Sequence, residues 1–325
     1  MKILLSDTSH LDPAPLRRAG HDVVLFNESE PVPVEHRDAE AMVLWGGGGN
    51  GDPTVLAQMA GYLTRLRWIQ TLAAGPDGVL AAGFDESVAI TSGRHFHDLT
   101  VAEHAAALAL ACVRRLPQVV RAADRREWLA GIGGAQPLDD PQRLTTLLGA
   151  RVLVWGFGAI GQATARLLTA FGATVRGVAR SAGERAGLEV VAVDDVESVL
   201  PETDLLVMVL PSTPSTAGAL SRERLALLPR RSVVVNVGRG STVDQVALEE
   251  ALRAGALSAA GLDVTDPEPL PAGSGLWDAP NVVITPHAAG GRPVGAAQRV
   301  LRNAALVEAT PVGEPVTGLE ALVRR

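Results

Sequence analysis

Residues 152–161 read VLVWGFGAIG, and this stretch decides the fold. A short apolar run, typical of a strand, breaks into three glycines and continues as a helical pattern. Glycines at this spacing let a strand turn tightly into a helix, whose free N–H groups can then face a pyrophosphate. With a second predicted strand at 174–179, the stretch predicts a dinucleotide site, against the alternative of a merely structural turn. The expected cofactor contacts here are Gly156, Gly158, Ala159, Ile160 and Gly161.

The composition indicates a two-domain α/β protein. At 325 residues the chain is too long for one ordinary core. Hydrophobic residues make up 47% of the chain but aromatic residues only 3%, so Ala, Val and Leu must build the core, as in helices packed on parallel strands. The net charge of −7, without a basic tract, argues against nucleic acid as a partner.

The cysteine content and the apolar segments bear on the cellular compartment. Cys112 is the only cysteine, which excludes an internal disulfide and a cysteine metal site, and we expect no metal site. The N-terminus MKILLSD lacks the features of a signal peptide. The apolar run 105–113 is far shorter than the ~20 residues that span a bilayer. We therefore expect a soluble, cytoplasmic protein with no membrane partner.

Two series of short apolar runs, separated by polar and Gly/Pro-rich segments, are typical of doubly wound α/β domains. The first series predicts strands at residues 3–5, 23–26, 42–45, 68–72 and 88–91. A long Ala/Leu helix at 101–116 and a polar stretch at 128–143 precede the second series. This second series predicts six strands, at 151–155, 174–179, 205–210, 233–237, 259–264 and 282–285. A final helix is expected at 294–309.

The end of the second strand in the cofactor domain bears on cofactor choice. An NAD-specific enzyme usually carries a carboxylate there for the ribose 2′-hydroxyl. In this chain the position is Ala179, and Arg180 and Ser181 follow it. A neutral residue followed by a fork donor and a hydroxyl suits a 2′-phosphate. We therefore favour NADP(H), with NAD(H) possible and a solvated surface arginine as the alternative.

The stretch 233–240, VVVNVGRG, is an apolar strand that delivers Arg239 to the carboxyl end of the sheet. In open α/β sheets ligands bind at that edge. Arginine can hold a carboxylate through two parallel hydrogen bonds, so Arg239 is a candidate anion-binding residue. A surface ion pair is the alternative.

Two further strand-to-loop stretches, GLDVTDPEPLP at 261–271 and NVVITPHAAG at 281–290, place charged side chains at the same predicted edge. These side chains are Asp263, Glu268 and His287. A carboxylate beside a histidine stabilises the imidazolium and suits acid/base chemistry near neutral pH. Singly, each residue would more often be structural. Together at one edge they indicate a catalytic site.

From residue 101 to residue 290 the chain resembles the D-isomer-specific 2-hydroxyacid dehydrogenases. The resemblance rests on VAEHAAALAL, GFGAIG, LPSTPST, VNVGRG, GLDVTDPEPLP and NVVITPH, in the order and spacing of that family. It implies that Arg239 binds the carboxylate and keto oxygen of the substrate, that His287 donates and accepts the proton, and that Glu268 pairs with His287. The further cofactor contacts that it implies are Leu210, Pro211, Val237, Gly238, Asp263 (to the nicotinamide carboxamide) and Gly290.

The resemblance also implies the domain organisation. A flavodoxin-like substrate domain of residues 1–99 and 289–325 would hold an inserted Rossmann-type cofactor domain of residues 100–288. The family's substrate loop corresponds to residues 73–79, AAGPDGV, where Ala74 and Gly75 could offer backbone N–H groups to a carboxylate. Pro76 departs from the usual pattern and donates nothing. Family members are typically dimers, so a homodimer is expected.

The expected activity is reduction of a small 2-oxoacid, or oxidation of the corresponding D-2-hydroxy acid, with glyoxylate and hydroxypyruvate as first candidates. One alternative is another oxidation on the same scaffold, of formate, phosphite or a phosphoglycerate-type substrate. The other is a dinucleotide-sensing binding protein related to the family's transcriptional co-repressors.

Overall fold

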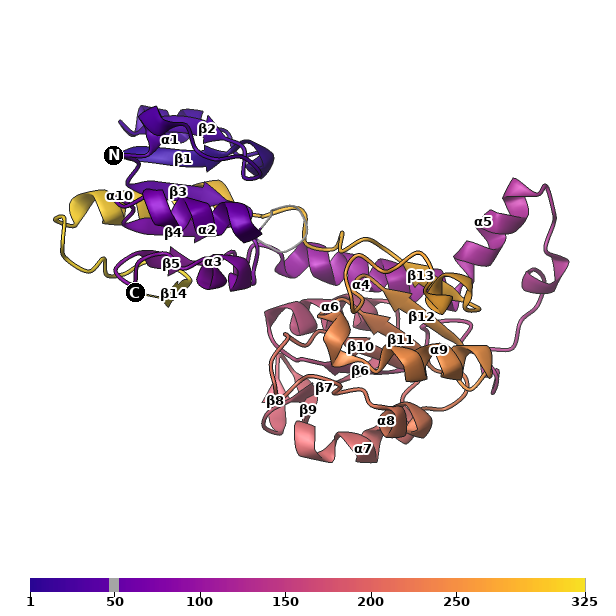
Figure 1. Cartoon of the computed structure of the whole chain (residues 1–325). Helices are drawn as coiled ribbons and strands as arrows, with labels where there is room; N and C mark the ends of the chain where they lie inside the picture. Colours follow the sequence, from indigo (N-terminus) through magenta and orange to yellow (C-terminus); the bar gives the residue numbers. More distant parts are fainter. Residues whose placement is uncertain (47–52, 325) are drawn as a thin grey trace. The chain divides into compact units, whose positions relative to one another are not determined.

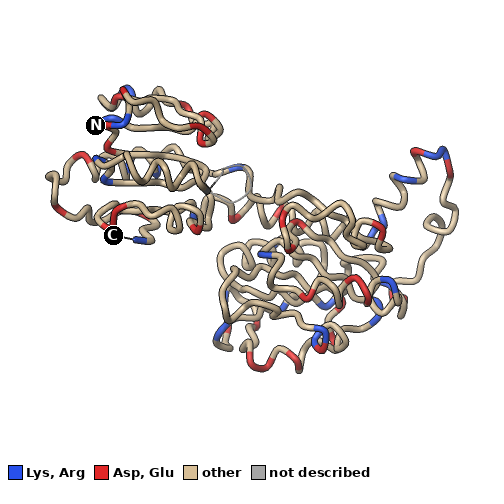
Figure 2. The backbone as a smooth tube through the Cα atoms, in the orientation of Figure 1, with Lys and Arg blue, Asp and Glu red and all other residues tan. Residues whose placement is uncertain are grey.

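The computed structural model describes residues 1–46 and 53–324 of the chain. These fold into two compact units: a first unit of Met1–His97 with Arg292–Arg325, and a second unit of Asp98–Gly291 (Figure 1). The first unit is discontinuous in sequence, and its boundaries lie within three residues of the predicted ones. Basic and acidic residues are interspersed in both units (Figure 2).

The first unit contains a six-stranded sheet of order β14-β5-β4-β3-β1-β2. Its strands are β1 (Lys2–Ser6), β2 (Asp22–Phe26), β3 (Ala41–Leu44), β4 (Trp68–Thr71), β5 (Ala89–Thr91) and β14 (Leu322–Arg324). The pairs are parallel except for β14, which runs antiparallel to β5. Taken without β14, the order 2-1-3-4-5 is that of flavodoxin-like folds, as predicted. Strand β14 was not predicted from the sequence.

Helices cover both faces of this sheet. They are α1 (Ala14–Arg18), α2 (Pro53–Tyr62), α3 (Asp77–Ala81) and α10 (Ala296–Ala309), with 3-10 turns at Asp7–Ser9 and Val34–His36. Ala296, Val300 and Ala304, at four-residue spacing on α10, are buried against one face of the sheet. Leu56 and Met59 of α2 are buried on the opposite face. The apolar stripe of α10 therefore ties the C-terminal segment to the first unit.

The second unit contains an eight-stranded sheet of order β13-β12-β11-β10-β6-β7-β9-β8. Its strands are β6 (Arg151–Trp155), β7 (Thr174–Ala179), β8 (Gly183–Arg185), β9 (Leu188–Ala192), β10 (Leu205–Met208), β11 (Val233–Asn236), β12 (Ala259–Leu262) and β13 (Val282–Ile284). All pairs are parallel except β8 with β9. The strand order reverses between β6 and β10, as at the ligand-binding edge of a Rossmann fold. The predicted fold class is confirmed.

All six strands predicted for this unit are present, but the predicted number was wrong, because β8 and β9 were not predicted. Strand β9 pairs in parallel with β7 and is the third strand of the Rossmann order, and β8 folds back on β9 as a short hairpin. The hairpin segment 183–192, GERAGLEVVA, mixes glycines and charged residues with only three consecutive apolar residues. Such a segment becomes a strand because β7 offers it a free edge, which local periodicity does not show.

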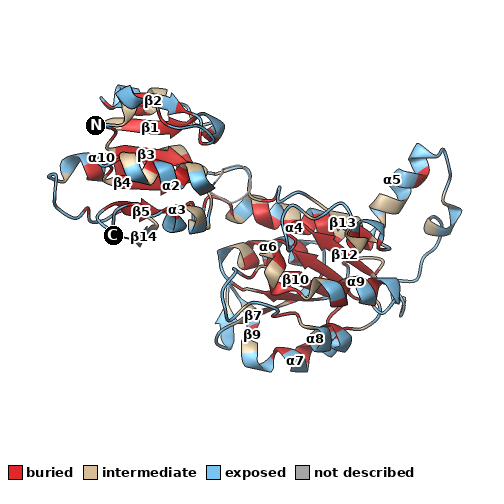
Figure 3. Cartoon of the chain, in the orientation of Figure 1, coloured by how far each residue is buried: buried red, intermediate tan, exposed pale blue. Residues whose placement is uncertain are grey.

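Helices of the second unit also pack on both faces of its sheet, except Leu116–Asp124, which contacts the helix before it (Figure 1). They are α4 (Asp98–Val113), α5 (Leu116–Asp124), α6 (Ala159–Ala170), α7 (Val196–Val199), α8 (Arg222–Leu227) and α9 (Gln245–Arg253), with 3-10 turns at Ala130–Ile132, Val193–Asp195, Leu200–Glu202, Gly240–Thr242 and Gly275–Asp278. The central strands β6, β10, β11 and β12 are buried almost throughout, whereas β8 and β9 at one edge of the sheet are largely exposed or half-buried. Helices α8 and α9 expose their outer faces (Figure 3). No helix in the described part of the chain has both the length and the apolarity to cross a membrane.

Helix α4 crosses one face of the second sheet. A Cβ atom on Gly261 of β12 would lie 3.0 Å from the side chain of Leu108, so this glycine lets the helix approach closely. Cys112, on the same helix, is buried, and burial raises the pKa of its thiol to about 12. The thiol is therefore an inert core group, as predicted.

A buried carboxylate fixes the amino ends of the central strands. Asp204, immediately before β10, has a fully buried side chain. Its Oδ2 accepts from the backbone N–H and Nε of Arg151, at 2.9 and 3.1 Å, and its Oδ1 accepts from Nη2 of Arg151 and Nε of Arg231, at 3.0 and 2.8 Å. Burial alone would raise the pKa of Asp204, but these bonds lower it to about 2.

Candidate active site

The glycine turn after β6 has the close contacts that a cofactor cradle requires. Gly156 has φ +104°, and a Cβ atom on it would lie 2.5 Å from the carbonyl oxygen of Val209. A Cβ atom on Gly161 would lie 2.4 Å from the carbonyl oxygen of Gly156, so the helix can begin directly against the turn. Nothing lies within 4 Å of a Cβ built on Gly158, which leaves the space above this residue open.

The first turn of α6 fits an anion. Gly158 is its N-cap and has no capping side chain, and no acidic residue lies in the first turn. Among the described residues, the N–H groups of Ala159 and Ile160 have no hydrogen-bond partner. Unpaired N–H groups at a helix N-terminus are suited to a pyrophosphate. The residues present therefore fit the phosphates of a dinucleotide.

Two neighbouring turns complete this edge of the sheet. A Cβ atom on Gly238, after β11, would lie 2.5 Å from the carbonyl oxygen of Leu210, after β10. The turns that contain Leu210 with Pro211 and Val237 with Gly238 are thus in direct contact. Gly290 lies farther along the loop that carries His287 and is partly buried.

The end of β7 carries a small basic cluster. Arg180 and Ser181 are exposed there, directly after Ala179. Nη2 of Arg185, on β8, donates to the hydroxyl of Ser181 at 2.9 Å and to its carbonyl oxygen at 3.1 Å. Arg185 was not predicted as a site residue, because the hairpin that brings it back to Ser181 was not predicted. The only sign of this contact in the sequence is that Arg185 follows Ser181 by four residues.

The turn after β11 holds Arg239 firmly by its backbone. The carbonyl oxygen of Arg239 accepts from Nδ2 of Asn236 at 3.0 Å and from the hydroxyl of Thr242 at 2.6 Å. Its Nη1 donates to the carbonyl oxygen of Gly238 at 2.7 Å. Among the residues described, no acidic side chain forms an ion pair with Arg239. The guanidinium is therefore available to an anionic ligand.

Gly240 brings the Arg239 turn against the next loop. A Cβ atom on Gly240 would lie 2.0 Å from the backbone of Thr265, so no larger residue fits without movement. The N–H of Thr265 donates in turn to Oε1 of Glu268 at 3.1 Å. This packing places Arg239 near the Glu268 carboxylate, and the two charges interact.

Glu268 and His287 form a hydrogen-bonded pair. Nδ1 of His287 lies 2.8 Å from Oε2 of Glu268. An ionised carboxylate can only accept, so Nδ1 carries the proton and Nε2 remains to exchange a proton with a ligand. Nε2 has no partner among the residues that the structure describes, and the side chain is 41% exposed.

The charge of Glu268 is stabilised by its surroundings. Burial alone would raise its pKa. The hydrogen bond from His287, the N–H of Thr265 and the positive charges of His287 and Arg239 outweigh burial and lower the pKa below its ordinary value of 4.5. The carboxylate is therefore ionised at neutral pH and can stabilise a protonated imidazole.

Asp263 lies at the predicted edge of the sheet, where its carboxylate contacts the loop that carries His287. It follows β12, and its side chain is only 1% exposed. Oδ1 accepts from the hydroxyl of Thr285 at 2.6 Å and from the N–H of Ala288 at 2.8 Å, and Oδ2 accepts from the N–H of Ala289 at 3.1 Å. The carboxylate is thus turned into the loop that carries His287.

Ala74 and Gly75 belong to the first unit, after β4 and just before α3. Ala74 is exposed and Gly75 is partly buried. The other predicted site residues all belong to the second unit.

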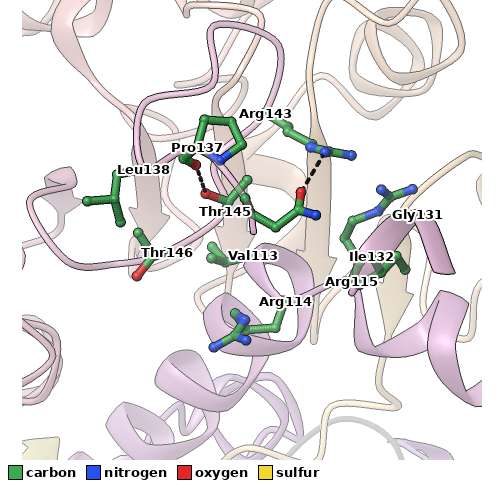
Figure 4. A pocket seen from close by; sticks show the side chains of 11 residues that line it. Val113, Arg114, Arg115, Gly131, Ile132, Pro137, Leu138, Arg143, Thr145 and Thr146 are labelled. Carbon is green, nitrogen blue, oxygen red and sulfur yellow. Dashed lines mark hydrogen bonds between the residues drawn. The ribbon is translucent and has the colours of Figure 1, made fainter. Parts of the chain in front are cut away.

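A cavity of about 240 Å³ lies elsewhere in the second unit, between the end of α4 and the segment before β6 (Figure 4). Arg114, Arg115 and Arg143 line it, and the hydroxyl of Thr145 donates to the carbonyl oxygen of Pro137 at 3.1 Å on one side. None of the predicted site residues lines this cavity. Within residues 1–46 and 53–324, no three His, Cys, Asp or Glu side chains are placed to hold a metal ion.

The chain is similar to known proteins in family, sequence and structure. The model of the NAD binding domain of the D-isomer specific 2-hydroxyacid dehydrogenases matches residues 106–289. D-3-phosphoglycerate dehydrogenase of Methanocaldococcus jannaschii is 29% identical over 88% of this chain, and the match spans 53% of that protein's length. Glyoxylate/hydroxypyruvate reductase B of Pectobacterium atrosepticum is 35% identical over 77% of this chain and 76% of its own.

Among solved structures, an NADPH-dependent glyoxylate/hydroxypyruvate reductase of Sinorhizobium meliloti, in complex with NADP and sulfate, has a TM-score of 0.73 and 27% identity. The match covers 99% of this chain and 98% of that one. The family match spans more than half of the chain and contains the glycine turn, Arg239, Glu268 and His287. The chain therefore belongs to the D-isomer specific 2-hydroxyacid dehydrogenases, a family of NAD(P)-dependent 2-hydroxyacid oxidoreductases.

Proposed function

We propose that this chain is an NADPH-preferring reductase of small 2-oxoacids, with glyoxylate and hydroxypyruvate as the first substrates to test. The observation that carries the proposal is the pair of His287 and Glu268, joined at 2.8 Å near the guanidinium of Arg239, which forms no ion pair with an acidic side chain of the described residues. An acid/base group next to a fork-shaped cation suits a ligand that has a carboxylate and an adjacent carbonyl.

Each of these side chains has a distinct role in the proposed reaction. Arg239 binds the carboxylate and polarises the adjacent carbonyl oxygen. His287, protonated on both nitrogens, donates the Nε2 proton to the oxygen as negative charge develops on it. Glu268 stabilises the imidazolium before the transfer and holds the ring afterwards through Nδ1. The bound nicotinamide supplies the hydride.

The second unit is the proposed cofactor domain. The N–H groups in the first turn of α6 would hold the pyrophosphate. The exposed Arg180 and Ser181, with Arg185 bonded to Ser181 at 2.9 Å, would hold the 2′-phosphate of NADP(H). The NADP-bound relative from Sinorhizobium meliloti supports this preference, and NAD(H) is the alternative.

The first unit is the proposed substrate domain, with the N–H groups of Ala74 and Gly75 as additional contacts to the substrate carboxylate. The cytoplasmic location stays a prediction from the sequence.

The proposal is tested by following NADPH oxidation with purified protein against a panel of 2-oxoacids. The panel should include glyoxylate, hydroxypyruvate and phosphohydroxypyruvate, the last because of the similarity to D-3-phosphoglycerate dehydrogenase. Formate and phosphite are tested with NADP⁺ in the opposite direction. The His287→Ala variant provides the blank rate. Tight NADPH binding without turnover of any substrate would replace the proposal with a dinucleotide-sensing binding protein.

We also propose that the protein is a homodimer formed through α5 and the segment after it. Charged residues follow one another toward the end of α5 (Figure 2), but Leu116, Val120 and Trp128 are 48, 59 and 94% exposed. Apolar exposure of this extent on one segment is typical of an interface. Sedimentation analysis of Trp128→Glu should show a monomer, and Val34→Glu, at an exposed site of the first unit, should leave a dimer. A monomeric wild type would contradict the proposal.

A further inference from the structure

The loop that carries His287 is held in a strained conformation. His287 has φ +51°, in the left-handed region that residues with a side chain rarely adopt. Its N–H donates to the carbonyl oxygen of Asp263 at 2.9 Å. Such a conformation persists only where the surrounding structure fixes it. Here Asp263 supplies the constraint. Its carbonyl oxygen holds the N–H of His287, and its carboxylate accepts from the N–H groups of Ala288 and Ala289, the two residues that follow.

The Asp263 carboxylate is itself fixed by a third element. The hydroxyl of Thr285 has one proton and donates it to Oδ1 of Asp263 at 2.6 Å. Nε2 of His104, on α4, lies 2.9 Å from that hydroxyl oxygen, which must therefore accept. The same Nε2 is 3.3 Å from Oδ1 of Asp263. The hydrogen bonds thus run in one direction: His104 donates to Thr285, and Thr285 donates to Asp263.

His104 is suited to this position. Its side chain is 24% exposed, whereas that of Asp263 is 1% exposed, so solvent reaches His104 but not Asp263. A buried carboxylate needs donors or an opposite charge. Among the described residues, no Lys or Arg forms an ion pair with Asp263, and His104 is the ionisable donor within reach.

We propose that His104 is a positioning residue for His287. It acts through Thr285 and Asp263, here called the Asp263 network, to keep the left-handed loop in place and the imidazole of His287 directed at Glu268. His104 does not contact the reacting atoms. The kinetic consequences rest on the function proposed above, but the effect on the His287–Glu268 hydrogen bond does not.

The test compares three variants. His104→Leu removes the donor at similar size, His104→Gln keeps an N–H donor near the position of Nε2, and Glu103→Gln changes an exposed neighbour on the same helix. The first readout is the imidazole NMR spectrum, in which His287→Ala assigns the Nδ1–H signal of the Glu268 pair. We expect His104→Leu to shift or abolish this signal, and His104→Gln and Glu103→Gln to retain it.

The second readout is kinetic. With glyoxylate and NADPH, His104→Leu should lower kcat by about 10- to 100-fold, the range that a small misplacement of a catalytic group produces. KM should change much less, because Arg239 is untouched, and His104→Gln should recover most of the loss. If His104→Leu does not fold, Thr285→Val breaks the network without changing α4 and should give the same loss.

An unchanged Nδ1–H signal and kcat in a folded His104→Leu protein of lower melting temperature would show a purely structural histidine and overturn the proposal. Equal losses in His104→Leu and His104→Gln would also overturn it, because the donor would then be irrelevant. Absence of wild-type turnover would instead contradict the proposed function, and the NMR comparison would still decide the role of His104.

Discussion

Gly240 packs directly on the backbone of Thr265, where a Cβ atom would lie 2.0 Å from the nearest carbon or oxygen. The contact presses the turn that carries Arg239 against the loop that carries Glu268. Gly240→Ala must push these segments apart, and overpacking of this kind costs about 1–3 kcal/mol of stability. We also expect kcat/KM for the 2-oxoacid to fall by about 100-fold, because the anion-binding and acid/base groups separate. Gly273→Ala, where nothing lies within 4 Å of the added Cβ, is the control and should match the wild type in melting temperature and turnover.

His287→Ala should lower turnover by about 100-fold or more, which is the usual contribution of general acid catalysis. Glu268→Gln should lower it less, since the ring stays in place without its stabilising charge. The pKa of Glu268 lies below its ordinary value of 4.5, so the carboxylate stabilises the pair at every pH above that value and loses this effect as the pH falls through the lowered pKa. Rates measured against pH should therefore show no loss of activity from Glu268 near neutrality. Wild-type turnover in His287→Ala would remove this residue from the mechanism.

Arg239→Lys keeps the positive charge but loses the planar fork of donors. We expect kcat/KM for glyoxylate to fall by about 100-fold, comparable with the loss of one positioned donor at a developing negative charge. The Kd for NADPH, measured by fluorescence titration, should stay near the wild-type value. Kinetics identical to the wild type would show that the substrate carboxylate binds elsewhere.

The basic cluster at the end of β7 should decide between the two cofactors. Arg180→Ala combined with Arg185→Ala removes two charge-assisted donors, so the Kd for NADPH should rise at least about 10-fold, while the Kd for NADH changes little. Adding Ala179→Asp should then favour NADH, because a carboxylate suits the ribose 2′-hydroxyl. Arg166→Ala, at an exposed position of α6, is the control. A wild type that already prefers NADH would refute the 2′-phosphate interpretation.

Asp204 should make the free energy of unfolding depend on pH in the acidic range. Its pKa is about 2 in the folded chain against an ordinary 3.8, so its contribution of about 2 kcal/mol is complete above that ordinary value and is lost as the pH falls toward 2. Asp204→Asn leaves Arg151 and Arg231 without their buried partner and should cost about 3–5 kcal/mol in denaturant unfolding near neutral pH. Asp139→Asn changes the exposed partner of Arg231 and should have little effect. Equal stability of both variants would contradict this account.

Much of the candidate site could be predicted from the sequence, because it depends on local transitions. Gly156, Arg239 and His287 each follow an apolar run closely, and the carboxyl ends of parallel strands share one edge. Sequence position alone was enough to bring them to that edge. The same reasoning predicts that Asp263 lies at this edge, but it does not predict where its side chain points. The direction of a buried carboxylate depends on which N–H groups of the loop surround it.

The missed elements depend on distant parts of the chain. Strand β14 pairs antiparallel with β5, from the opposite end of the first unit's sequence. Arg185 approaches Ser181 only because β8 folds back on β9. His104 lies in a helix whose sequence is mostly apolar, and its contact with Thr285 joins residues far apart in sequence. Local periodicity carries no information about such pairings.

The shielded sulfur of Cys112 gives the protein a practical advantage for labelling. A thiol that stays protonated inside the core does not compete for maleimide or iodoacetamide reagents. Cysteines introduced at the exposed positions of Glu86 and Ala107, one in each unit, would therefore react selectively with fluorophores or spin labels, and the native residue could stay. Energy transfer between two such probes would then follow the separation of the units in solution during turnover.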